Sequence, residues 1–171
     1  FTLFRNNGFG QFTGFVSTTL GAGFVFTRDI ESGDIDNDGD FDLVIADSGT
    51  TDGALLFVND GTGAFSPAPT PLVTATGFNT VSVALADFNN DGNLDIAIAD
   101  QSVSNTIEVS LGAGNGLFSG VASFVTTQVS GASGLVAADF DNDGLPDLAQ
   151  VERFGGNTLT VLRNTTAPQA L

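Results

Sequence analysis

Three short segments of the sequence repeat one pattern of acidic residues, Asp-x-Asp/Asn-x-Asp-Gly-x-x-Asp. Oxygen-bearing side chains stand at positions 1, 3, 5 and 9, and glycine at position 6 permits a sharp turn. Calcium takes about six to eight oxygen ligands from carboxylates, amides, carbonyls and water. The side chains that we expect to bind calcium at three sites are Asp34, Asp36, Asp38 and Asp42, then Asp87, Asn89, Asp91 and Asp95, and finally Asp139, Asp141, Asp143 and Asp147.

Position 7 of the pattern carries side chains of unrelated chemistry, namely those of Asp40, Asn93 and Leu145. A residue that contributes only its backbone carbonyl to a metal tolerates any side chain. We therefore expect these three carbonyls to add one ligand to each site.

An EF-hand is a different calcium loop, which needs Glu at position 12 and two flanking helices. Here position 12 is Ile45, Ile98 or Gln150, and the closing acid stands at position 9. The flanking residues read as strands. The EF-hand interpretation is therefore rejected.

Any one of these segments alone could be an ordinary Asp/Asn/Gly turn that caps a hairpin. Three copies in one register favour a metal site, because each crowds acids that repel one another without a cation. The second segment has one carboxylate fewer, since position 3 is Asn89, and we expect it to be the weakest site. Mg²⁺ is disfavoured because it demands a stricter octahedron than calcium.

The segments recur with a period of 53 and then 52 residues, beginning at Asp34, Asp87 and Asp139. A second marker, Gly-x-Gly-x-Phe, keeps nearly the same step and begins at Gly8, Gly61 and Gly114. Two independent markers on one period identify an internal repeat.

Each repeat reads as four short strands separated by Gly/Asn/Asp/Ser turns, and no window shows a helical stripe. The strands expected in the middle repeat are Thr80–Ala86, Asp95–Asp100, Thr106–Gly112 and a looser one near Ala122–Gln128. Four strands in about 50 residues are typical of a β-propeller blade. A solenoid is the alternative, but solenoid repeats are usually shorter.

The predicted fold is all-β, with about three propeller blades of four antiparallel strands in one repeat domain, 1–171. The expected parts are 1–25, the outer strands of a preceding blade; 26–78, blade 1; 79–130, blade 2; 131–165, an incomplete blade 3; and 166–171, a tail. Propellers usually have about four to eight blades. We therefore expect a part of a larger propeller, or an assembly that supplies the missing blades.

The charge of the chain excludes several classes of function. Twenty acidic residues face four arginines, for a net charge of −16, and Lys, His, Cys and Tyr are absent. We expect neither nucleic-acid binding nor membrane insertion. The missing residue types include most general bases and nucleophiles, so we expect no enzyme.

The remaining acids, such as Glu31, Asp47, Asp100 and Glu152, are expected at turns or on the surface. Most phenylalanines are expected in blade cores.

The Asp-rich loops and the Gly-x-Gly-x-Phe turns together resemble the FG-GAP/VCBS repeats of integrin-α-type β-propellers. The resemblance covers nearly the whole chain. It implies that each loop joins the two innermost strands of a blade and binds calcium through the side chains and carbonyls named above. Proteins with these repeats include adhesion receptors, lectins, extracellular bacterial proteins and some enzymes.

The predicted function is that of a calcium-binding extracellular structural or adhesion module, whose loops rigidify the blades and support protein–protein assembly. The expected partners are other copies or further repeats, through open blade edges, and a cell-surface protein or a glycan. The alternative is a calcium-stabilised propeller lectin that binds carbohydrate between blades. Asn164 begins the single Asn-x-Ser/Thr sequence and is a candidate for glycosylation.

Overall fold

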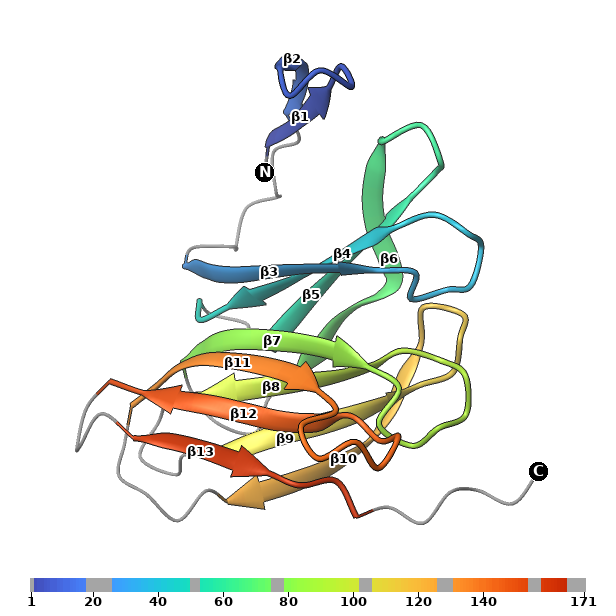
Figure 1. The fold of residues 1–171 in the computed structure, drawn as a ribbon. Helices are drawn as coiled ribbons and strands as arrows, with labels where there is room; N and C mark the ends of the chain where they lie inside the picture. Colours follow the sequence, from blue (N-terminus) through green and yellow to red (C-terminus); the bar gives the residue numbers. More distant parts are fainter. Residues whose placement is uncertain are drawn as a thin grey trace.

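The computed structural model describes residues 2–17, 26–49, 53–74, 79–101, 106–125, 131–153 and 158–165. These residues form thirteen β-strands in four antiparallel sheets, and no helix occurs among them. The first sheet is a hairpin of β1 (Thr2–Asn6) and β2 (Phe12–Ser17). The other three are stacked against one another (Figure 1).

The three stacked sheets are named the first, second and third blade. The first contains β3 (Thr27–Gly33), β4 (Asp42–Asp47), β5 (Gly53–Asn59) and β6 (Phe65–Thr74). The second contains β7 (Thr80–Ala86), β8 (Asp95–Asp100), β9 (Thr106–Gly112) and β10 (Phe118–Val125). The third contains β11 (Ala132–Ala138), β12 (Asp147–Glu152) and β13 (Leu159–Leu162). The predicted all-β fold of propeller-like blades is confirmed.

Strand β8 shows why these sequences form central strands. All six of its residues, DIAIAD, are buried, because a blade lies on each face of its sheet. A strand covered on both faces is apolar at successive positions rather than at alternate ones.

Two apolar layers hold the blades together. The layer between the first and second blades consists of Ile35, Val44, Ala46, Ala54, Leu56, Ala68, Val83, Ile96 and Ile98. The layer between the second and third blades consists of Ala84, Phe88, Ala97, Ala99, Ile107, Val109, Ala132, Leu135 and Leu148. Each layer thus combines alanines with larger apolar side chains, most of them branched aliphatic, from the two blades that it joins.

A chain of hydrogen bonds also links the first strands of the three blades. Strand β7 lies between β3 and β11 (Figure 1). Asp29 on β3 accepts hydrogen bonds from the Ser82 hydroxyl and from the Val83 N–H, the latter at 3.2 Å. The Ser82 oxygen in turn accepts the N–H of Leu135 on β11 at 3.1 Å. Side chains at equivalent repeat positions therefore fix the offset between neighbouring blades.

The fourth strand of the middle repeat begins earlier than predicted. Strand β10 begins at Phe118 instead of Ala122, because its pairing with β9 starts at the Phe of the Gly-x-Gly-x-Phe turn, with Phe118 opposite Gly112. The predicted end of this strand, 126–128, and the predicted tail, 166–171, lie outside the described residues.

Three of the acids expected at turns or on the surface are buried instead. Asp47, Asp100 and Glu152 are 0%, 1% and 4% exposed, whereas Glu31 is exposed as expected. They occupy equivalent ends of β4, β8 and β12. There, Asp47 accepts hydrogen bonds from the N–H groups of Phe26 and Gly49 at 3.3 and 3.2 Å. The buried carboxylate thus gives these backbone donors the acceptor that water would provide at an exposed strand end.

The expectation that most phenylalanines pack in blade cores is wrong for the described residues. Phe57 and Phe88 are buried, but six others are at least 47% exposed: Phe4, Phe9, Phe12, Phe26, Phe41 and Phe140. Several belong to the hairpin β1–β2, and Phe41 is at position 8 of the first Asp-rich segment. Phe140 is at position 2 of the third segment, where the equivalent Ile35 and Phe88 are buried in the layers between blades. No helix among the described residues has the length and apolarity needed to cross a membrane.

Candidate metal centres

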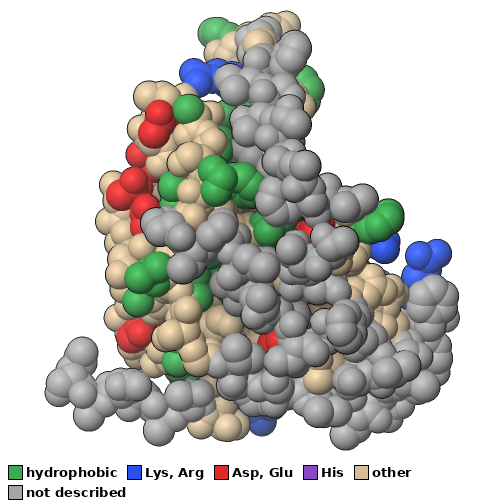
Figure 2. Space-filling model, turned by 180° about the vertical axis from the view of Figure 1, so that it is seen from behind, with side chains coloured by type: hydrophobic (Ala, Val, Ile, Leu, Met, Phe, Trp, Pro, Cys, Tyr) green, Lys and Arg blue, Asp and Glu red, His purple; other side chains and the backbone are tan. Residues whose placement is uncertain are grey.

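The three Asp-rich segments form loops between the first and second strands of the three blades. We call Asp34–Asp42, Asp87–Asp95 and Asp139–Asp147 the first, second and third loop. They lie on the same side of the stack (Figure 1), and Figure 2 shows Asp and Glu side chains gathered along one edge of the molecule. The repeat therefore places three acidic loops on one edge.

The aspartate at position 1 folds each loop around its own carboxylate. In the first loop, Asp34 accepts the N–H groups of Asp38 and Gly39 at 3.1 and 3.0 Å. The equivalent distances are 3.0 and 2.7 Å in the second loop and 3.2 and 3.0 Å in the third. Glycine at position 6 permits this turn, since its φ is 97° in the first loop, a conformation that side chains disfavour.

The aspartate at position 9 ties each loop to the third strand of its blade. Asp42 is fully buried and accepts the Ile35 N–H at 2.9 Å and the Asn59 N–H, at the end of β5, at 2.8 Å. Asp95 and Asp147 make the same pair of bonds, with distances between 2.7 and 3.1 Å. Each closing carboxylate is therefore held in one place before any ion binds.

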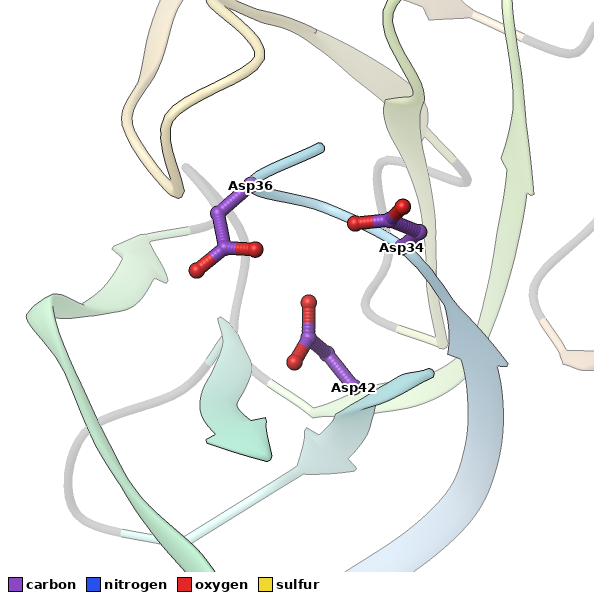
Figure 3. Close-up of side chains that lie close together, drawn as sticks. All are labelled: Asp34, Asp36 and Asp42. Carbon is purple, nitrogen blue, oxygen red and sulfur yellow. The ribbon is translucent and has the colours of Figure 1, made fainter. Parts of the chain in front are cut away.

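Three carboxylates converge in the first loop. Single oxygens of Asp34, Asp36 and Asp42 lie within 4.8 Å of one another, and Figure 3 shows the carboxylates turned toward a common space. The Oδ1 atom of Asp36 is buried and has no hydrogen-bond partner among the described residues. Burial, followed by the charges of Asp42 and Asp38, raises the pKa of Asp36 above its usual range, and burial also raises the pKa of Asp42.

This first group fits a hard cation. A buried carboxylate oxygen without a donor is costly unless a positive charge approaches it. Carboxylate oxygens in such a group are the ligands that calcium prefers. The residues present can therefore hold a metal ion, and the predicted donors at positions 1, 3 and 9 are those brought together.

The third loop repeats this group but includes an arginine. Oxygens of Asp139, Asp141 and Asp147 lie within 4.8 Å of one another. Arg163, which follows β13, forms an ion pair with Asp141, and its Nε donates to Oδ2 at 2.7 Å. This pair lowers the pKa of Asp141. The arginine therefore occupies one predicted ligand, for which a metal ion would have to compete.

Sequence reasoning did not identify Arg163 as part of the site. A signal was present, because the repeat aligns Arg163 with Val58 and Leu111, both apolar. A charged residue that replaces an apolar one at a repeat position indicates a local partner, and here the partner is the third loop.

The second loop lacks a three-carboxylate group of this kind because Asn89 replaces an acid. The Asn89 amide donates to Asp91 at 2.9 Å and its oxygen accepts the Asp91 N–H at 3.0 Å. Hydrogen bonds from the Asn93 N–H and then the Asn89 amide lower the pKa of Asp91. The pKa of Asp95 is raised, chiefly by burial. The amide thus partly replaces the cation that the other loops would need.

The predicted ligands at position 5 are not among the carboxylates grouped in the first and third loops. Asp38, Asp91 and Asp143 are exposed, and each accepts the N–H of position 7 at 2.9 Å. These bonds hold the predicted carbonyl donors, Asp40, Asn93 and Leu145, on the loops. The position-5 side chains support the loop turn in this structure.

The Gly-x-Gly-x-Phe turn packs against the loop of its own blade. A Cβ atom added at Gly61 would lie 2.5 Å from Asp40 Oδ2, and one added at Gly114 would collide with Asn93 Oδ1. The positive φ of Gly61 and Gly114, 77° and 70°, favours glycine at the start of the turn, and the side chain at position 7 occupies the space beside it. The two sequence markers of the repeat are neighbours in the fold.

The side-chain amide of Asn164, the candidate glycosylation site, forms a hydrogen bond with another blade. The Nδ2 atom of Asn164 donates to the Phe88 carbonyl at 2.8 Å, and Asn164 is partly buried. A glycan attached to this nitrogen would leave it a single N–H and would have to fit beside the Phe88 carbonyl. Thr166 of the same motif lies outside the described residues.

Fold and site together define a class of protein: stacked β-sheets of propeller-blade type, each with an Asp-rich loop between its first two strands. The family model of the FG-GAP-like repeat matches residues 34–98 and again residues 87–149, which together cover more than half of the chain. The protein belongs to the FG-GAP-like repeat family, as predicted. Repeats of this family often bind calcium and are typically extracellular. No curated protein matches the sequence.

Proposed function

We propose that this protein is a calcium-binding, non-catalytic module whose three loops rigidify propeller-type blades for assembly or adhesion outside the cell. The observation that carries the proposal is the group of Asp34, Asp36 and Asp42, with the buried and unpartnered Oδ1 of Asp36. Calcium supplies a divalent charge that offsets carboxylate repulsion in each loop. Three ions would change the net charge from −16 to about −10.

The loop residues convert ion binding into blade stability. The position-1 aspartate holds the turn of the loop, and the position-9 aspartate holds the loop against the third strand. An ion shared by these carboxylates joins three segments of one blade. Because the unfolded chain has no such site, ion binding stabilises the folded state with increasing ion concentration.

Calorimetric titration and thermal unfolding test this role. We expect calcium to bind and to raise the melting temperature relative to excess chelator. Asp36→Asn gives the first loop the residue found at position 3 of the second, and we expect roughly tenfold weaker binding at that loop. Glu31→Gln, an exposed change outside the loops, is the matched control. Equal melting temperatures in calcium and in chelator would refute the proposal.

The third blade carries an open face that fits an assembly role. Val136, Val151, Leu159 and Val161 point to one side of this sheet, and they are 52%, 47%, 67% and 46% exposed. The repeat-equivalent residues of β4, β5, β8 and β9 are at most 7% exposed, because the next blade covers them: Ala46, Ala54, Leu56, Ala99, Ile107 and Val109.

The proposed occupant of the open face is a blade from a second copy of this chain. Such a contact is head-to-tail, so it forms rings or filaments rather than an isologous dimer. Sedimentation over a range of concentrations in calcium should show association, and Leu159→Glu should abolish it. Leu117→Glu, at a turn residue that is 40% exposed, should leave it intact. Monomers at every concentration would contradict this assembly.

A lectin remains the second candidate because two exposed aromatic rings lie on the metal loops. Phe41 and Phe140 are 68% and 47% exposed, and aromatic faces can pack on sugar rings. A glycan array in calcium distinguishes the two functions. Binding that is lost in Phe41→Ala would favour the lectin, and an array without signal would favour the structural module.

An extracellular location is part of the proposal. Exposed acidic loops suit the high calcium concentrations outside cells, and location can be checked by fractionation of the source cells. A catalytic role is not proposed, since the loop carboxylates are assigned to metal and Asp47 and Glu152 accept hydrogen bonds at strand ends.

A further inference from the structure

The first and second loops are in direct contact, although their residues are far apart in sequence. The side-chain amide of Asn37, at position 4 of the first loop, donates to the Asn93 side-chain oxygen at 2.9 Å. It also lies 3.4 Å from the Gly114 carbonyl. Nearby, the Gly116 N–H donates to the Ile35 carbonyl at 3.1 Å. The first loop therefore rests on both the loop and the turn of the second blade.

The Asn93 side chain is confined by these contacts. Asn93 is position 7 of the second loop, whose carbonyl is a proposed calcium ligand, and its N–H donates to Asp91 at 2.9 Å. Gly114 leaves just enough space for the Asn93 side chain, since a Cβ there would collide with it. The same Cβ would also collide with Asn37 Nδ2, so Asn37, Asn93 and Gly114 meet at one point between the two blades. Asn37 is thus placed to position a ligand-bearing residue of the neighbouring site.

The same contact cannot recur between the second and third loops. Asn90 and Asn142 share the backbone conformation of Asn37, with φ values of 59° and 61° against 60°. The residue equivalent to Asn93 in the third loop is Leu145, whose side chain has no hydrogen-bond acceptor. The loop backbones are therefore alike, and the inter-loop bond is specific to one pair.

We propose that Asn37 is a positioning residue that couples calcium binding at the first and second loops. Ordering of the first loop by an ion fixes Asn37, and Asn37 fixes Asn93 and the turn of the second loop. The second loop is then already partly ordered, so it loses less conformational entropy when it binds calcium, and it binds calcium more tightly. Coupling of this kind is reciprocal. The inference rests on the proposed calcium function, and the third loop does not share this coupling.

Asn37→Gly in the full chain is the decisive change, because glycine readily adopts the positive φ and lacks the side-chain donor. Asn142→Gly makes the same change in the third loop and is the matched control. Calcium binding at each loop is followed by the NMR amide signals of Gly39, Gly92 and Gly144 during titration. We expect Asn37→Gly to weaken binding at the second loop by about threefold to tenfold, the range for one hydrogen bond. Asn142→Gly should leave the second loop unchanged.

Two backgrounds separate coupling from a general loss of structure. Asn93→Leu introduces the residue of the third loop and removes the acceptor, so Asn37→Gly should have no further effect there. Asn93→Asp introduces the residue of the first loop and keeps an acceptor, so the effect should persist. Equal effects of Asn37→Gly in both backgrounds, or an equal effect of Asn142→Gly, would overturn the coupling.

The outcomes also distinguish this inference from the proposed function. If the three loops bind calcium and Asn37→Gly does not change the second, the coupling alone is wrong. If no loop responds to calcium, both are wrong. The Asn37–Asn93 bond itself can be checked in chelator, where slow exchange of the Asn37 side-chain amide is expected.

Discussion

The Gln150 side chain lies at an apolar position of the interface between the second and third blades. It shares a row of the sheet with Leu135 and Thr160, and it is fully buried. Neither Nε2 nor Oε1 has a hydrogen-bond partner among the described residues. The equivalent positions of the other blades hold Ile45 and Ile98, which are 3% and 1% exposed. We therefore predict that Gln150→Ile stabilises the fold.

The magnitude of this gain follows from the two unpaired polar atoms. A buried amide without partners costs roughly 1–3 kcal/mol in proteins. Isoleucine removes that cost, is no longer than glutamine and has a higher β-propensity. We expect the free energy of unfolding to increase by about 1–3 kcal/mol, and the melting temperature to rise by roughly 2–4 °C for each kcal/mol.

Guanidinium unfolding at fixed calcium concentration measures the effect, since an unchanged slope with a higher midpoint reports stability alone. The reciprocal change, Ile98→Gln, should lower stability by roughly 2–4 kcal/mol. A Gln150→Ile variant that is less stable than the parent would refute the reasoning. It would mean that the amide of Gln150 is satisfied in solution.

Three further predictions concern single contacts. Arg163→Gln should strengthen calcium binding at the third loop by about threefold to tenfold, because it frees Asp141 from its ion pair, whereas Arg28→Gln should not; calorimetric titration measures both. Ser82→Ala should lower the free energy of unfolding by about 1–3 kcal/mol, because it breaks the hydrogen-bond chain between the blades; denaturant unfolding measures the loss, and an unchanged midpoint would contradict it. Hydrogen bonds from the turn after β5 hold the pKa of Asp60 below its usual range, so this carboxylate stabilises the fold at neutral pH and loses that effect as the pH falls through the lowered pKa. An NMR titration of Asp60 that gave an ordinary pKa would show this prediction to be wrong.

The strands and loop turns of the repeat were accessible from the sequence because they depend on nearby residues. The boundaries of Thr80–Ala86, Asp95–Asp100 and Thr106–Gly112 agree with β7, β8 and β9. The loop is built by hydrogen bonds from Asp34 to residues four and five positions later. Such short-range geometry follows from residue type and spacing.

Contacts between distant residues were not accessible in the same way. The bond between Asn37 and Asn93 joins residues 56 positions apart, and the pair of Arg163 and Asp141 spans 22. Neither pair is encoded by a local pattern. Each depends on the offset at which one strand or blade lies beside the next.

Burial of the strand-end acids has the same cause. Asp47, Asp100 and Glu152 stand at the ends of strands, where acids are usually solvated. Residues just outside the strands of the same blade contact these carboxylates, since Asp47 accepts the Phe26 N–H and Glu152 accepts the Thr158 hydroxyl. Burial of this kind depends on how the strands of a blade pair and not only on the strand that carries the residue.

The sequence by itself determined the repeat, the all-β architecture and the acidic loops, because a nine-residue pattern and alternating strands act over short distances. Only the tertiary structure decided which oxygens converge, which loop contains an arginine and which two loops touch. Those features arise where blades pack, and small changes of residue at the packed positions, such as Leu145 for Asn93, alter them without changing the repeat.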